Sequence, residues 1–347
     1  MFESNKGARS VPYDRSPIDP TPSDPEAAPE APDRGGRVQR PRVGVALGGG
    51  SARGYAHIGV LAALERRDLA PDVLVGTSFG AVIGALYALG HDPARLRADA
   101  ERLRRRDVLP RIVDVGARRG ALFAGVRLGA YFESLVGDAR IEALPRTLAV
   151  VATDLDTGER VVLREGPLAL ALRASASLPG LFAPVPWEGR RLIDGGIGAP
   201  VPLETLAGFD VDLAIGVGAG IEARDSRTLR AARRAASSRA GRWTSRALRG
   251  RRPVEDPRGQ RPWRTLGRAL ALTFDAWGDQ ADALPEGDGG VHLQTRPPIH
   301  WLGFDRAAEA IVAGDAAFER AWPRFGAWLA DWRDPVAPGA TIAVERS

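Results

Sequence analysis

Residues 72–84 have the sequence Asp72-Val-Leu-Val-Gly-Thr-Ser-Phe-Gly-Ala-Val-Ile-Gly84, in which a short apolar run ends at Gly76 and a helical pattern follows at once. This pattern predicts a sharp strand-to-helix turn with Ser78 at its apex. Glycines at positions 76 and 80 would let the two backbone segments pass closely while Ser78 Oγ projects outward. The motif is typical of a nucleophile elbow, although an ordinary glycine-rich turn has the same short pattern.

The segment before this turn predicts a β-α-β unit. Val43-Gly-Val-Ala-Leu47 has a strand pattern, a glycine-rich loop follows, and residues 55–66 have a helical pattern. Because crossovers between parallel strands are right-handed, we expect the glycine-rich loop and the serine turn to lie side by side at the carboxyl edge of one sheet.

The glycine-rich loop, Gly48-Gly-Gly-Ser-Ala-Arg-Gly54, predicts an anion-binding concavity made of backbone N–H groups. It matches neither nucleotide fingerprint, because the sixth residue from Gly48 is Arg53 and no lysine follows Gly54. An oxyanion hole needs only amides about 3 Å from the attacked carbonyl oxygen. The Arg53 side chain could brace the loop or hold a phosphate. The predicted oxyanion hole consists of Gly49, Gly50, Ser51 and Arg53, supported by Gly48 and Gly54.

A third segment contains a candidate acidic residue, Asp194. The apolar pair Leu192-Ile193 precedes it, which predicts that Asp194 lies at the end of a strand, and Gly195 and Gly196 follow it. Two glycines let the chain turn away at once, which predicts an exposed carboxylate. Alone, Asp-Gly-Gly usually marks a turn, so Asp194 becomes a candidate functional residue only in combination with the other two segments.

Together these segments resemble the patatin-like phospholipase family. The resemblance covers Arg42 to Gly208 and rests on four stretches. They are Gly48-Gly-Gly-Ser-Ala-Arg-Gly-Tyr-Ala-His-Ile-Gly-Val-Leu61, Gly76-Thr-Ser-Phe-Gly80, Arg173-Ala-Ser-Ala-Ser-Leu-Pro-Gly-Leu-Phe-Ala-Pro184 and Asp194-Gly-Gly196. One departure is Ser51, which stands where the family's loop commonly has a glycine. Serine still has an N–H to donate, with less freedom in φ.

The resemblance implies a three-layer α/β/α fold with a mostly parallel central sheet. It also implies a serine acyl hydrolase without cofactor, acting on phospholipids or lysophospholipids. Ser78 would be the nucleophile and Asp194 the general base of a covalent mechanism. A free aspartate, with a pKa near 4, is a poor base for a serine hydroxyl. Either its surroundings raise its basicity, or the oxyanion hole supplies most of the transition-state stabilisation.

Two other functions remain open at this level. Ser78, Asp194 and His292 or His300 follow the chain order of an α/β-hydrolase triad, but only one strand precedes the serine's strand. A noncatalytic lipid- or anion-binding scaffold would keep the same fold. The four histidines are scattered without metal-ligand spacing, so we expect no catalytic metal.

Composition sets the domain limits. The chain has 347 residues, 44% of them hydrophobic, and no cysteine, which excludes disulfides and thiolate chemistry. We expect a disordered tail over 1–40, a catalytic core over 41–220, an Arg-rich insertion or linker over 221–265, C-terminal helices and a strand over 266–332, and a tail over 333–347. The chain shows neither a signal-peptide pattern nor a run of about 18 apolar residues. The expected location is therefore cytoplasmic, with any membrane contact peripheral.

The segment Arg224–Arg264 is strongly basic, with fourteen arginines against three acidic residues. Such a segment could dock on anionic lipid headgroups, with Trp243 and Trp263 entering the interface. Arginine replaces lysine through most of the chain, so compositional bias explains part of this charge. Nucleic-acid binding is not expected, because no binding module is recognisable and aromatic residues are sparse.

Overall fold

A computed structural model describes residues 40–103, 110, 114, 121, 123–219, 290–300 and 302–333. The described helices are α1 (Ala56–Glu65), α2 (Phe79–Ala88), α3 (Pro93–Arg102), α5 (Val126–Val136), α6 (Leu168–Ser175) and α10 (Ala307–Arg333). The described strands are β1 (Val43–Leu47), β2 (Val73–Thr77), β3 (Thr147–Asp154), β4 (Arg160–Leu163), β5 (Val185–Trp187), β6 (Arg190–Asp194), β7 (Leu213–Gly218) and β8 (Gly290–Gln294). Short 3-10 helices occupy Ser51–Tyr55, Ile141–Ala143, Gly195–Ile197 and Leu203–Gly208.

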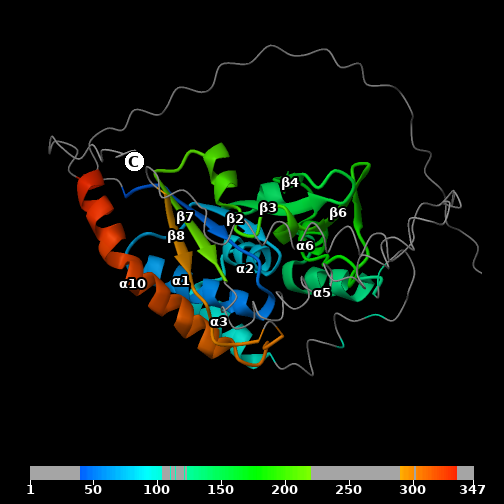
Figure 1. Cartoon of the computed structure of the whole chain (residues 1–347), viewed down its shortest axis with the longest axis horizontal. Coiled ribbons are helices and arrows are strands. Elements are labelled where there is room, and N and C mark those ends of the chain that lie inside the picture. The colour runs from blue at the N-terminus through cyan, green and yellow to red at the C-terminus, as the bar shows by residue number, and fades with distance from the viewer. Residues whose placement is uncertain are drawn as a thin grey trace, which may run out of the picture. The chain divides into compact units, whose positions relative to one another are not determined.

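The strands form one mixed, mostly parallel sheet in the order β5-β6-β3-β2-β1-β7-β8, with β4 also paired to β3 (Figure 1). Strands β3, β2, β1, β7 and β8 run parallel, whereas β4 and β6 are antiparallel to β3. Leu47 pairs with Gly76 at the carboxyl ends of β1 and β2. The predicted β-α-β unit is thus confirmed, and its two loops leave the sheet side by side.

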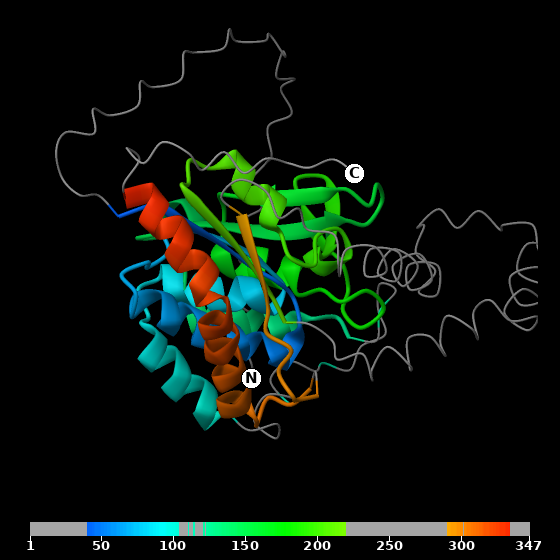
Figure 2. The ribbon, with the colours of Figure 1, turned by 60° about the vertical axis from the view of Figure 1, so that its left-hand side comes forward.

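Alternate residues of the strands bury against different layers, as expected for a sheet covered on both faces. Val45, Leu47 and Leu74 belong to the core shared with α1, α2, α6 and α10. Ala46 and Val75 face the opposite way and pack with Leu206, which lies in the 3-10 helix Leu203–Gly208. Figure 2 shows α10 crossing beside the sheet. This confirms the three-layer α/β fold, with the thicker helical layer on the face that carries α1 and α2.

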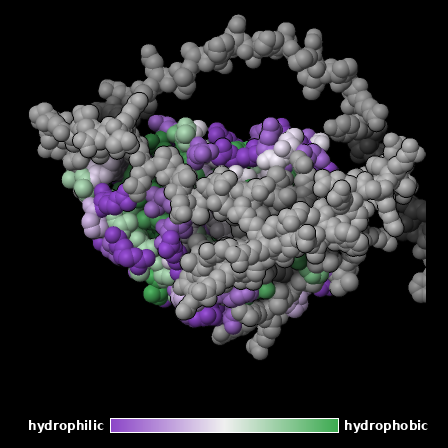
Figure 3. Space-filling view, in the orientation of Figure 1, coloured by the Kyte–Doolittle hydropathy of each residue, from purple (hydrophilic) through white to green (hydrophobic). Residues whose placement is uncertain are grey.

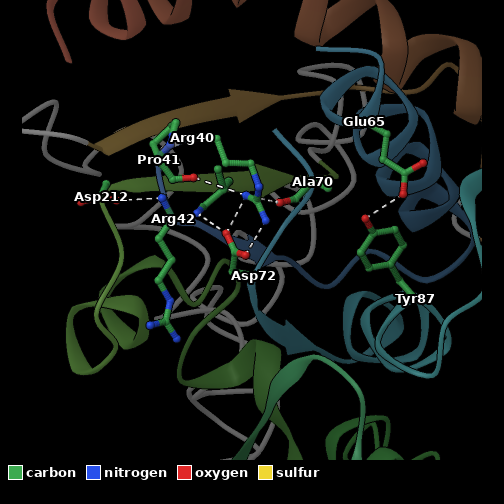
Figure 4. A network of polar contacts seen from close by, with 9 residues as sticks. Arg40, Pro41, Arg42, Glu65, Ala70, Asp72, Tyr87 and Asp212 are labelled. Atoms are coloured by element: carbon green, nitrogen blue, oxygen red, sulfur yellow. Dashed lines mark hydrogen bonds and ion pairs between the residues drawn. The ribbon is translucent and has the colours of Figure 1, made fainter. Parts of the chain in front are cut away.

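A polar clamp holds the amino ends of β1, β2 and β7 together, at the opposite end of the strands from Ser78 (Figure 4). The Arg40 guanidinium donates to both Asp72 carboxylate oxygens, at 2.9 and 2.6 Å. Asp72 Oδ2 also accepts from the Val43 amide at 2.8 Å, and Asp212 accepts from the Arg42 amide at 2.7 Å. These bonds fix the register in which β1 enters the sheet between its neighbours.

Helices α1 and α10 pack closely because each has a glycine at the crossing. A Cβ added to Gly59 would collide with the Ile311 carbonyl oxygen, and one added to Gly314 would collide with the Ala56 carbonyl oxygen. Charged pairs flank this contact, including Arg67 with Glu319 at 2.8 Å. Figure 3 shows hydrophilic patches along the side of the molecule where α10 runs.

Several predicted segments lie outside the described residues. These are the Arg-rich segment 221–265 and, apart from Arg40 and Arg333, the two tails 1–40 and 333–347. Strand β8 and helix α10 are the described parts of the C-terminal region predicted over 266–332. Among the described residues, no helix combines the length and apolarity needed to span a bilayer.

Replacing Gly59 with alanine should lower the free energy of unfolding by about 2–3 kcal/mol, because the new methyl group must push α10 away from α1. Gly129→Ala is the matched control: Gly129 lies inside α5 with nothing within 4 Å of an added Cβ. This control should raise the stability by about 0.5–1 kcal/mol through helix propensity. Urea denaturation of the two variants measures both effects. Equal midpoints would contradict the close helix crossing.

Candidate active site

Ser78 stands at the apex of the turn between β2 and α2. Its backbone is strained, with φ 53° and ψ −123°, in a region that non-glycine residues rarely adopt. A Cβ on Gly76 would collide with Ala81 Cα, and one on Gly80 would collide with the Leu47 carbonyl oxygen. The glycines at 76 and 80 are therefore required by close backbone approach, as the sequence predicts.

Asp194 lies against Ser78. Ser78 Oγ donates to Asp194 Oδ2 at 2.7 Å, and the Gly196 amide donates to Asp194 Oδ1, also at 2.7 Å. The antiparallel pairing of β6 with β3, in which Ala152 faces Asp194, brings the acid to the serine. The Asp194 amide donates to the Ser177 carbonyl oxygen at 2.9 Å. The acid is thus held by its backbone as well as by its side chain.

The prediction that Asp194 is exposed is wrong, since only 3% of the residue is accessible. Gly195 and Gly196 do not turn the chain into solvent but form the 3-10 helix Gly195–Ile197, packed on β3. A Cβ on Gly195 would collide with the Val151 carbonyl oxygen. Burial raises the pKa of Asp194 to about 6, although the bonds from Ser78 and Gly196 favour its ionised form. The carboxylate is therefore a stronger base than a free aspartate.

The glycine-rich loop lies beside the serine. A Cβ added to Gly49 would stand 3.5 Å from Ser78 Cβ. The Gly48 amide donates to the Val217 carbonyl oxygen and the Gly49 amide to the Pro200 carbonyl oxygen, both at 2.9 Å. Gly54 packs against the Phe79 ring. The loop is thus clamped to the ends of the sheet by its first two amides.

The predicted oxyanion donors divide into two groups. The Gly49 amide is already used by Pro200, and the Arg53 amide donates to the Gly50 carbonyl oxygen at 3.2 Å. No hydrogen bond joins the N–H groups of Gly50 or Ser51 to the described part of the chain. Ser51 adopts φ 52°, the left-handed region that favours glycine. Gly50 and Ser51 therefore have the amides able to donate to a ligand oxygen, which corrects the inclusion of the Gly49 and Arg53 amides as donors.

Arg53 braces the loop from behind. The side chain is buried, and its Nε donates to the Ile299 carbonyl oxygen at 3.0 Å. This bond ties the loop to the segment between β8 and α10. Of the two roles suggested by the sequence for the Arg53 side chain, bracing is the one these contacts support.

His57, on α1, holds the same loop. Its Nε2 lies 2.8 Å from the Gly48 carbonyl oxygen, and since a carbonyl only accepts, Nε2 carries the proton. The ring is fully buried, and burial lowers its pKa to about 4. His57 is thus a neutral positioning residue and does not act as a base.

The histidines of the alternative triad have other partners. His292 lies on β8, at the opposite edge of the sheet from β6, and its Nε2 contacts Gln294 Nε2 at 3.3 Å. His300 Nδ1 accepts from the Leu302 amide at 3.2 Å. Within the described residues, neither is hydrogen-bonded to Ser78 or Asp194. This geometry favours a serine–aspartate pair over the triad.

Two supporting residues were not assigned roles from the sequence. Ser175 Oγ accepts from the Ser78 amide at 2.7 Å and donates to the Val151 carbonyl oxygen at 2.6 Å, which pins the elbow to β3. The buried Arg173 guanidinium donates to the carbonyl oxygens of Gly125 and Ala183, at 2.8 and 3.0 Å. Both lie in the motif beginning at Arg173, but their partners are brought near only by tertiary folding.

An apolar cavity of about 770 Å³ opens from Ser78. It runs along α2, whose Val82 and Leu86 line it, and its wall also includes residues of α3, α5 and the segment around Phe304. Most of these residues are apolar; the charged ones are Arg95, Asp99 and Arg102 of α3. Cavities of this size hold drug-sized or larger apolar ligands. Its lining includes Ser51, Tyr55, Ile58, Phe79, Ile83, His91, Leu96, Phe123, Leu128, Tyr131, Phe132, Leu135, Leu178, Phe182, Leu302 and Phe304.

Comparison with known proteins gives a family match that includes both Ser78 and Asp194. Residues 45–207 match the family model described as patatin-like phospholipase. The chain is 41% identical over 182 residues to an uncharacterized NTE family protein of Mycobacterium tuberculosis, covering 51% of this chain and 49% of the relative. It is 36% identical over 168 residues to a patatin-like phospholipase domain-containing protein of Caenorhabditis elegans, covering 47% of this chain and 12% of the relative.

The chain spans about half the length of the first curated relatives it matches. Among solved structures, VipD from Legionella pneumophila aligns with a TM-score of 0.41 at 14% identity, covering 82% of this chain and 67% of VipD. The type III effector ExoU aligns with a TM-score of 0.32 at 18% identity, covering 55% of this chain and 45% of ExoU.

Asp194→Asn should stabilise the protein at pH 8 and leave its stability nearly unchanged at pH 4. The folded pKa of about 6 exceeds the unfolded value near 3.9, so the folded wild type loses stability as pH rises through this window. Two pKa units correspond to about 3 kcal/mol. Urea denaturation of both proteins from pH 4 to 8 measures the difference, which should grow and then level off above pH 6.5.

His57 acts in the opposite direction, because its folded pKa lies below the unfolded value and stability is lost as pH falls from 6.5 toward 4. It is present in both proteins and cancels in the difference. A difference that stays constant across the range would contradict a buried, ionising Asp194.

Proposed function

Because the match over residues 45–207 makes this chain a member of the patatin-like phospholipase family, we propose that it is a serine acyl hydrolase cleaving fatty-acyl esters of phospholipids or lysophospholipids. The observation that carries the proposal is the 2.7 Å hydrogen bond from Ser78 Oγ to Asp194 Oδ2 at the end of an apolar cavity. A long hydrocarbon chain fits such a lining, and the hydrogen bond gives the serine a base.

The proposed reaction is covalent. Asp194 takes the Ser78 proton as Oγ attacks the ester carbonyl, and the amides of Gly50 and Ser51 stabilise the oxyanion. The proton then passes to the leaving alcohol, which departs from the acyl-enzyme. A water molecule, deprotonated by Asp194, attacks the acyl group and releases the fatty acid while Ser78 Oγ recovers a proton.

The raised pKa of Asp194 supports this role for a carboxylate without a histidine. Efficient proton transfer requires a base whose pKa lies near the working pH. Burial raises the pKa of Asp194 to about 6, two units nearer neutrality than a free aspartate. The first turn of α2, which begins directly after Ser78, adds the positive end of a helix dipole beside the developing charge.

The anionic membrane surface proposed as a partner of Arg224–Arg264 remains a separate proposal, since that segment lies outside the described residues. It would bring a lipid substrate to the site without taking part in the chemistry.

Ser78→Ala should abolish labelling by a fluorophosphonate probe and hydrolysis of long-chain p-nitrophenyl esters and lysophospholipids. Asp194→Asn should lower kcat about a thousandfold, because asparagine cannot accept the serine proton. Asp154→Asn is the matched control, since Asp154 is also buried but accepts from the Asp156 amide in a turn, at 2.8 Å. Its kcat should stay close to the wild-type value.

An unlabelled, folded wild type that hydrolyses none of these esters would instead favour a noncatalytic lipid- or anion-binding scaffold. Loss of activity in His292→Ala or His300→Ala, as well as in Asp194→Asn, would favour the triad, whereas loss in Asp194→Asn with retention in both histidine variants supports the dyad.

The pH profile provides an independent prediction. If ionised Asp194 is the base, kcat/KM should rise tenfold per pH unit below pH 6 and level off above it. The profile should be recorded on the free enzyme with a substrate that does not titrate. A plateau extending unchanged down to pH 4 would rule out Asp194 as the base.

A further inference from the structure

Tyr55 occupies the wall of the cavity next to the reacting serine. It ends the 3-10 helix that begins at Ser51 and is only 2% exposed. Its ring packs edge-on against Phe79, at 5.0 Å between centroids, and against Phe304, at 6.3 Å. All three rings line the cavity. Because Phe79 directly follows Ser78, Tyr55 stands at the beginning of the channel in which an acyl chain would lie.

The Tyr55 hydroxyl is buried and has no hydrogen-bond partner in the part of the chain that the structure describes. Burial raises its pKa above the ordinary value, so it stays protonated and able to donate. Buried polar atoms of native proteins are generally paired, so an unpaired hydroxyl in a cavity wall indicates a missing partner. Phenylalanine would fill the same space without this cost.

Tyr87 provides the contrast within the same protein. It is also fully buried, but its hydroxyl donates to Glu65 Oε1 at 2.8 Å, and Tyr87 does not line the cavity. The hydroxyl of Tyr87 therefore has a structural use. That of Tyr55 does not have one among the described residues.

The surroundings of Tyr55 restrict what its hydroxyl can meet. The Phe79 and Phe304 rings that pack on Tyr55 are apolar, and the Tyr131 side chain, which also lines the cavity, lies near enough to help raise the pKa of Tyr55 but makes no hydrogen bond with its hydroxyl. A plain hydrocarbon chain would therefore leave the hydroxyl unpaired. In the proposed reaction, Ser78, Gly50 and Ser51 hold the ester group. Because Tyr55 packs against Phe79, the residue after Ser78, its hydroxyl belongs to the part of the wall that the first carbons of the acyl chain would meet, and an oxygen on those carbons would supply the missing partner.

We propose that Tyr55 is a specificity-determining residue whose hydroxyl hydrogen-bonds a hydroxyl or keto oxygen near the carbonyl end of the acyl chain. The preferred substrates are then esters of oxygenated acyl chains. This inference rests on the proposed function, because it takes the cavity as the acyl site. It adds a chemical requirement that a purely apolar channel would not impose.

The test compares p-nitrophenyl decanoate with p-nitrophenyl 3-hydroxydecanoate. Wild type should show a kcat/KM about tenfold higher for the hydroxylated ester, the effect of one hydrogen bond to an otherwise unpaired buried group. Tyr55→Phe should abolish this ratio without lowering the midpoint of urea denaturation. Tyr87→Phe, the matched control, should lower the midpoint and keep the ratio.

A second measurement separates this inference from the proposed function. In Ser78→Ala, 3-hydroxydecanoic acid should raise Tm more than decanoic acid does, and adding Tyr55→Phe should remove the difference. If wild type cleaves neither ester but this binding difference is found, the proposed function fails and the inference about Tyr55 stands. If wild type cleaves both esters equally, or Tyr55→Phe keeps the tenfold ratio, the inference is overturned while the hydrolase remains.

Discussion

The hydrogen bond from Ser78 Oγ to Asp194 Oδ2 joins residues 116 positions apart, so its formation depends on how the strands of the whole sheet are paired. Ser78 must leave β2 at the carboxyl edge, and β6 must pair antiparallel with β3 so that Asp194 ends beside the same edge. The clamp of Arg40 and Asp72 at the other end of the strands fixes the register. A shift of one residue in either pairing would separate hydroxyl and carboxylate.

Several features of the site cost stability, and they cluster in space around Ser78. Ser78 and Ser51 both have positive φ, Asp194 ionises in a buried position, and the Tyr55 hydroxyl lacks a partner in the described chain. Each such feature costs on the order of 1–3 kcal/mol. The fully buried strand β1 and the core around α1, α2 and α10 offset these costs. Unfavourable local features of this kind are expected at functional sites, where the rest of the fold offsets their cost.

Burial shifts the pKa values of two titratable residues near the glycine-rich loop, Asp194 and His57, in opposite directions. Burial raises the pKa of Asp194 and lowers that of His57, and in both cases it favours the neutral form. The division of roles follows from this. His57 stays neutral at working pH and holds the Gly48 carbonyl, whereas Asp194 changes charge near pH 6 and can exchange a proton with Ser78. A histidine is present at the site, but as a brace for the loop.

Local sequence was enough to predict the β-α-β unit and the turn at Ser78, because spacing, glycine positions and apolar runs are properties of short segments. The pairing of Ser78 with Asp194 was implied by the resemblance of the combined motifs to a known family, not by any one segment. Local sequence could not determine the burial and the hydrogen-bond partners of the site residues. Asp194 is buried because Gly195 packs on β3, the Gly49 amide is taken by Pro200, and Ser175 supports the elbow from α6. These contacts join segments 44, 151 and 97 positions apart (195 to 151, 200 to 49 and 175 to 78), so only the tertiary structure determined which amides are available and how basic the acid is.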